Sequence, residues 1–159
     1  MKILLPIDGS LPALEAVRHA IGLIEHGLRA SFVLVNVQEP PSLYEVVVAH
    51  DADVIDQVRG AAGTDVLRSA EALVDAAGVD YESEVVSGDP AHQLVDQLEN
   101  YGCDAVVMGS RGVSKPAAAD IGSVAQSVLR HSPVPVTVVR PRPDERADAV
   151  AGEGSESGE

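Results

Sequence analysis

The segment ILLPIDGS, from Ile3 to Ser10, sets the pattern of the whole chain, because an apolar run passes directly into a helix start. The run Ile3 to Ile7 predicts a buried strand, and Asp8-Gly9-Ser10 is typical of a turn followed by a helix N-cap. Pro12 suits the first turn of a helix, where no backbone donor is needed. The apolar residues that follow recur at spacings of three and four and predict one helical stripe: Leu14, Val17, Ile21, Ile24 and Leu28.

The same alternation of strand and helix recurs along the chain. Further strands are predicted at 32–37, 81–86, 104–108 and 133–139. Helices are expected over 51–77 with Gly78 as C-cap, after Asp89-Pro90, and from Gly122-Ser123 onward. Residues 42–50 are interpreted as a loop or the entry to a helix. This order predicts an α/β fold, a doubly wound five-stranded parallel sheet with helices on both faces.

The composition limits the class of protein. With 159 residues, 45% of them hydrophobic, the chain predicts one globular domain, 1–141, and a disordered acidic tail, 142–159. Aromatic residues make up only 3% and the net charge is −14, which argues against nucleic acid as a partner. No apolar run approaches the roughly 20 residues of a membrane span, so we expect a cytoplasmic protein without membrane contact.

Two further features concern the surface and the core. The surplus of acids suggests a salt-adapted, halophilic organism, and ordinary acidic drift in a high-GC genome is the alternative. Cys103 is the single cysteine, and we interpret it as a small buried hydrophobe. The run His50-Asp51-x-Asp53 is interpreted as a solvated loop, and we expect no metal site in the protein itself.

A candidate site lies where strands end. In an open parallel sheet a ligand binds beyond the carboxyl ends of the strands, where the strand order reverses. If the first strand is central, Asp8 lies beside Gly109, and both Gly109-Ser110-Arg111-Gly112 and the helix start at Gly122-Ser123 offer backbone N–H groups to an anion. This pattern favours a phosphate or nucleotide.

Each of these residues also has a structural interpretation that remains open. The glycine-rich segment could be only a turn, and Arg111 could serve solubility alone. Asp8 could form an Asx turn or cap the first helix with the help of Ser10. Ser123 is expected to be an N-cap whether or not a ligand binds.

The spacing Gly109-x2-Gly112-x9-Gly122-Ser123 resembles the signature of ATP-binding members of the universal stress protein family. The likeness extends to the opening strand and turn, to Val33–Pro40 and to Val124–Pro141. It implies strand order 3-2-1-4-5, a dimer, and binding of ATP with Mg²⁺. By position it implies Asp8 at the adenine and ribose, Val37 at the adenine, and several phosphate-binding residues. The implied site is Pro6, Ile7, Asp8, Val37, Met108, Gly109, Arg111, Gly112, Gly122, Ser123 and Val124.

The favoured function is a small stress-response regulator, a nucleotide-dependent binding module acting on an unidentified protein partner. No catalytic residues are predicted, because no general base is visible and Gly112 is not followed by the lysine of a P-loop. The alternatives are a nucleotide-free interaction protein of the same fold and a slow ATPase. A homodimer through the last strand, Val134–Val139, is expected because an apolar edge without lysine favours pairing.

Overall fold

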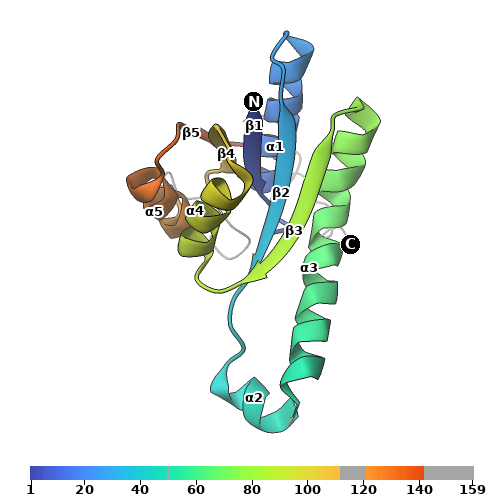
Figure 1. The fold of residues 1–159 in the computed structure, drawn as a ribbon, viewed down its shortest axis with the longest axis vertical. Coiled ribbons are helices and arrows are strands. Elements are labelled where there is room, and N and C mark those ends of the chain that lie inside the picture. The colour runs from blue at the N-terminus through green and yellow to red at the C-terminus, as the bar shows by residue number, and fades with distance from the viewer. Residues whose placement is uncertain (50, 112–120, 142–159) are drawn as a thin grey trace, which may run out of the picture.

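The computed structural model describes residues 1–49, 51–111 and 121–141. Five parallel strands form one sheet in the order β3-β2-β1-β4-β5 (Figure 1), which confirms the predicted order. Successive elements alternate as expected, apart from one additional helix. The strands are β1 (Lys2–Pro6), β2 (Ser31–Gln38), β3 (Tyr81–Ser87), β4 (Ala105–Gly109) and β5 (Val136–Val139); the helices are α1 (Leu11–Glu25), α2 (Leu43–Ala49), α3 (Ala52–Ala77), α4 (Pro90–Tyr101) and α5 (Ser123–His131).

Two apolar clusters cover the two faces of the sheet. Ile3, Leu5 and Phe32 pack with α1 and α3 on one face, whereas Leu4 and Val33 pack with α4 and α5 on the other. Because β1 and β2 are buried on both faces, they carry apolar residues at consecutive positions. The doubly wound architecture is therefore confirmed. Cys103 is buried in the second cluster, and burial raises the pKa of its thiol.

Helix α2 replaces the loop or helix entry expected at 42–50. Its start is a capping box, in which the Ser42 N–H donates to Glu45 Oε2 over 2.7 Å and the Glu45 N–H donates to Ser42 Oγ over 3.3 Å. The sequence Ser42-Leu43-Tyr44-Glu45 carries this signal, so the helix was predictable from residue types. The sequence prediction instead treats this valine-rich run as a loop or the entry to a helix.

Other element limits differ from the predictions by a few residues. α1 ends at Glu25, so Leu28 lies beyond the helix, although it still packs on the first cluster. β5 begins at Val136 rather than at residue 133, and β4 begins at Ala105. Gly78 ends α3 with φ 69°, as predicted for a left-handed C-cap.

Helix α3 is longer than the sheet it covers. Its 26 residues span about 39 Å at 1.5 Å per residue. The seven residues of β3 span only about 23 Å. The first turns of α3 therefore extend beyond the sheet, and α2 lies at that end (Figure 1). In the described residues no helix is both long and apolar enough to cross a membrane.

Candidate nucleotide-binding site

A pocket of about 340 Å³ lies at the carboxyl ends of β1 and β4, where the strand order reverses, beside the start of α5. Ten of the eleven predicted site residues line it, and Gly112 lies outside the described residues. The ten are Pro6, Ile7, Asp8, Val37, Met108, Gly109, Arg111, Gly122, Ser123 and Val124. Sequence elements about a hundred residues apart thus meet at one site, while the contacts of these residues with a nucleotide stay a prediction.

The turn after β1 holds the Asp8 carboxylate in place. The Ser10 N–H donates to Asp8 Oδ1 over 2.9 Å, and the Ser10 hydroxyl donates to the same oxygen over 2.5 Å. Ser10 also caps α1, because its Oγ accepts from the Ala13 N–H at 3.2 Å. The Asx-turn interpretation is therefore confirmed. One Asp8 oxygen is occupied by the turn, and the exposed carboxylate still lines the pocket.

A buried amide supports this turn from behind. Asn36 on β2 is only 3% exposed, and its Nδ2 donates to the Ile7 carbonyl over 2.8 Å. Its Oδ1 accepts from Gln38 Nε2 at 2.6 Å. Because an unsatisfied buried amide is costly, this pair fixes the direction of the chain into Asp8. Asn36 was missed in the sequence, although a lone amide inside the run 32–37 was a visible signal.

Gly109 is required for close packing. A Cβ at this position would lie 2.6 Å from the Pro12 carbonyl carbon and 2.8 Å from the Ala13 nitrogen, both backbone atoms. The end of β4 therefore approaches the start of α1 more closely than a residue with a side chain at position 109 would permit. This contact gives Gly109 a structural role in addition to the predicted ligand contact.

Gly122 links the segment 121–123 to the segment 109–111 by a backbone hydrogen bond. Its N–H donates to the Ser110 carbonyl over 2.8 Å, and a Cβ on it would lie 3.3 Å from that oxygen. The segments 109–111 and 121–123 are thus held side by side at the pocket.

The predicted N-cap role of Ser123 is wrong. Gly122 is the N-cap of α5, Ser123 is the first helical residue, and no described side chain caps the helix. The first intrahelical bond recorded at this end runs from the Gln126 N–H to the Gly122 carbonyl, at 3.0 Å. The N–H groups of Ser123, Val124 and Ala125 precede it and have no intrahelical acceptor. Such a helix start, at the wall of a pocket, suits an anion.

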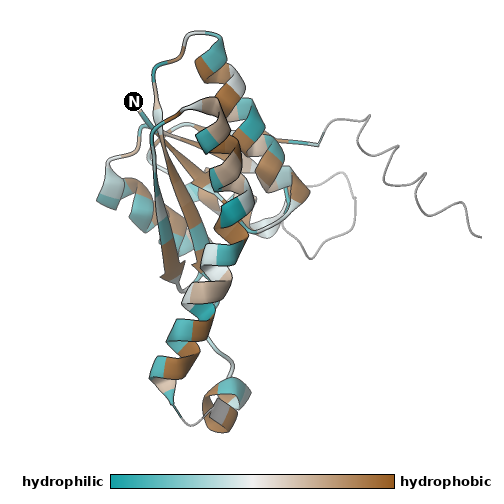
Figure 2. Ribbon diagram, turned by 90° about the vertical axis from the view of Figure 1, so that its right-hand side faces the viewer, coloured by the Kyte–Doolittle hydropathy of each residue, from teal (hydrophilic) through white to brown (hydrophobic). Residues whose placement is uncertain are grey.

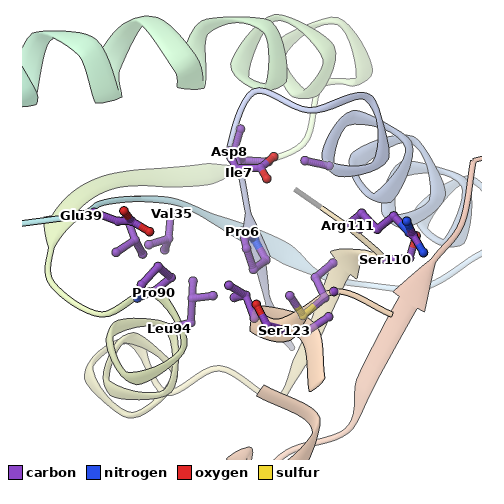
Figure 3. Close-up of a pocket in the computed structure, with 17 residues that line it drawn as sticks. Pro6, Ile7, Asp8, Val35, Glu39, Pro90, Leu94, Ser110, Arg111 and Ser123 are labelled. Carbon is purple, nitrogen blue, oxygen red and sulfur yellow. The ribbon is translucent and has the colours of Figure 1, made fainter. Parts of the chain in front are cut away.

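Sequence reasoning missed one whole wall of the pocket. Pro90 and Leu94 from α4 lie near Val35 and Glu39, across the pocket from Ser110 and Arg111 (Figure 3). Val35, Pro90 and Leu94 present an apolar surface, whereas the opposite end offers backbone donors. Pro90 was recognised only as a helix start, and nothing in the sequence indicated that α4 faces this site.

The charges at the pocket have both signs. Asp8 and Glu39 are exposed carboxylates on its wall, and Arg111 lies at the edge far from Glu39 (Figure 3). No group of three or more His, Cys, Asp or Glu side chains that could hold a metal occurs in the described part of the chain. The arrangement combines an apolar wall with a helix start of the kind that suits an anion.

A doubly wound parallel sheet with a pocket at its strand ends, where the strand order reverses, defines a class of α/β domain. Residues 1–140 match the universal stress protein family, and the chain belongs to that family. Universal stress protein YxiE from Bacillus subtilis is 31% identical over 87% of this chain and 98% of its own length.

Two solved structures are similar. Universal stress protein UspA from Lactobacillus plantarum superimposes with a TM-score of 0.73 at 23% identity, over 88% of this chain and 97% of its own, which shows the common fold. A universal stress protein in complex with cAMP has a TM-score of 0.61 at 26% identity, over 88% of this chain and 96% of its own.

Proposed function

We propose that this protein binds ATP with Mg²⁺ in the strand-end pocket and acts as a nucleotide-dependent binding module in the stress response. The observation that carries the proposal is that an apolar wall meets, in one pocket, a start of α5 that no side chain among the described residues caps. The relative in complex with cAMP supports an adenine nucleotide as the ligand class. We place the protein in the cytoplasm of a salt-adapted organism, as the acidic composition indicates.

The geometry suggests how the ligand lies. The adenine fits against Val35, Val37 and Leu94, near the carboxylate of Asp8, which would face the ribose. The phosphates fit between residues 109–111 and the N–H groups of Ser123 and Val124, which have no intrahelical acceptor. Because Asp8 and Glu39 add negative charge to the same pocket, a bound cation would reduce their repulsion of the triphosphate. Pro6, Ile7 and Met108 would form the floor.

The binding experiment combines mass spectrometry of nucleotide released from purified protein with calorimetry. We expect a micromolar-range Kd for MgATP and weaker binding when Mg²⁺ is chelated. Gly122→Val should weaken binding at least about tenfold, because a branched side chain beside the Ser110 carbonyl would separate the two phosphate-binding segments. Gly22→Val is the matched control, since a Cβ there meets no atom within 4 Å.

The results discriminate between the candidate functions. Released adenine nucleotide and a selective effect of Gly122→Val support the proposed site. A protein that carries no nucleotide and shows no heat with MgATP would instead be the nucleotide-free interaction protein. Unchanged affinity of Gly122→Val would refute the site assignment. Release of phosphate from ATP over hours would identify the slow ATPase.

We also propose a homodimer through the last strand, Val134–Val139. β5 is an edge of the sheet and carries no charged residue, so no strand among the described residues pairs with its outer backbone groups, which a second copy would satisfy. Val136 and Val138 are half-buried against the cluster of α4 and α5, whereas Thr137 is exposed. Thr137 is consequently the better position for a charge that tests pairing without disturbing the core.

A further inference from the structure

A second apolar surface lies far from β5. We use the word arm for α2 together with the first turns of α3, residues 43–49 and 52–60, which extend beyond the sheet (Figures 1 and 2). Its large apolar side chains are unusually exposed. They are Leu43 (85%), Tyr44 (77%), Val46 (46%), Val47 (65%), Val48 (57%), Val54 (48%) and Val58 (64%).

Helix α2 is apolar around its whole circumference. In its sequence LYEVVVA the only charged residue is Glu45, whose Oε2 pairs with Arg59 Nη2 at 2.9 Å. A helix that is apolar on every face is ordinarily buried. α3 covers one face of α2 only in part, because a groove of about 500 Å³ remains between the two helices. The groove is lined mainly by Tyr44, Val48, Val54, Ile55 and Val58.

We propose that the arm is an interface at which a second copy of this chain docks. The exposed fractions amount to about four fully exposed large side chains, or on the order of 400 Å² of apolar surface. A standard interface buries about 800 Å² on each partner, of which somewhat more than half is apolar. The arm therefore carries most of the apolar surface that one side of a stable dimer needs.

Charge favours a second copy at this face. The chain carries a net charge of −14, so two copies can meet only where little of that charge is present. Among the groove-lining residues, the one acid, Glu45, is already paired with the one base, Arg59. Asp53 and Asp56 lie on the other side of α3 from Val54 and Val58 by helical spacing. Outside the groove the arm carries Asp53 and Asp56, with Asp51 at the N-cap of α3, whereas the groove lining itself offers only the paired Glu45 and Arg59.

The arm is also complementary to itself. Leu43 and Val47 are four residues apart and form a ridge on α2, whereas the groove runs between α2 and α3. About a two-fold axis, the ridge of each copy can enter the groove of the other, which is the requirement for a closed isologous pair. Arg59 ties the start of α3 both to Glu45 on α2 and to the Glu39 carbonyl after β2. Because these contacts already fix the groove, docking requires little further ordering of its side chains.

This interface is separate from the one proposed at β5. α3 covers β2 and β3, whereas β5 is the opposite edge of the sheet, so both surfaces can be occupied at once. Two different isologous contacts on one chain predict an assembly larger than a dimer. The inference does not depend on nucleotide binding.

The experiment measures association in a background where β5 pairing is blocked. Thr137→Lys protein is studied by sedimentation equilibrium over a wide concentration range at moderate salt. It should still dimerise, and adding Leu43→Glu with Val47→Glu should weaken that association about a hundredfold. Leu11→Glu with Leu23→Glu is the control, because it adds the same charge at exposed leucines of α1. Circular dichroism checks that every variant is folded.

The outcomes decide the proposal. Loss of dimer in the arm variant but not in the control supports it. Thr137→Lys protein that is monomeric at every concentration overturns it and leaves the arm to a partner of another kind. Equal weakening by both pairs of substitutions also overturns it, because the effect would then come from added charge alone.

Discussion

Gly63 and Gly60 lie in the same helix, α3, but replacing each by alanine should change the stability of the protein in opposite directions. A Cβ on Gly63 would lie 2.5 Å from Val85 Cγ1 and 2.9 Å from Asn36 Oδ1, whereas a Cβ on Gly60 meets no atom within 4 Å. Asn36 cannot move away freely, because its amide bonds both the Ile7 carbonyl and Gln38. α3 thus approaches the sheet closely at Gly63, while Gly60 stands in the part of the helix beyond it.

The expected free energies follow from two opposing effects. Alanine is favoured over glycine inside a helix by about 1 kcal/mol, at both positions. At Gly63, forcing in a methyl group costs about 1–3 kcal/mol, because Val85 and Asn36 must shift. Gly60→Ala should therefore stabilise the protein by about 0.5–1 kcal/mol. Gly63→Ala should destabilise it by the difference between the two effects, up to about 2 kcal/mol.

Urea unfolding followed by circular dichroism measures both variants against the parent. In a thermal melt, at about 2–4 °C per kcal/mol for a domain of this size, the midpoint should fall by up to about 8 °C for Gly63→Ala and rise by about 1–4 °C for Gly60→Ala. An unchanged m-value in both would show that the folded state is comparable. If Gly63→Ala stabilises as much as Gly60→Ala, the close contact between α3 and the sheet is refuted.

Two further predictions concern titration and assembly. The Tyr101 hydroxyl donates to Glu84 Oε2 over 2.7 Å, and this bond, together with burial, raises the pKa of Tyr101 to about 12. The stabilisation that this hydrogen bond provides should be complete below about pH 10 and be lost as the pH rises to about 12. An ultraviolet titration measures the pKa, with Tyr101→Phe as the reference. An ordinary pKa for Tyr101 would contradict this prediction. Thr137→Lys should abolish association through β5, so light scattering should give a smaller assembly than for the parent, and an unchanged mass would argue against pairing there.

Much of the fold was readable from local pattern. The apolar runs of β1 and β2 and the cap signals at Ser10 and Gly78 placed nearly every element. The family resemblance that the glycine spacing around Gly109 and Gly122 carries implied ten of the residues that line the pocket. These features depend on a residue and its close neighbours in the chain, which a sequence displays directly. The capping box of α2 belongs to the same class and could have been used.

The tertiary structure alone decided which elements approach each other and how closely. The sequence shows two glycines in α3 without distinguishing them, and only the position of the sheet makes Gly63 indispensable and Gly60 replaceable. It shows Pro90 as a helix start, and only the fold turns α4 toward the pocket. The physical reason is that periodicity reports which face of an element is apolar, whereas distance and partner depend on contacts between segments far apart in the chain.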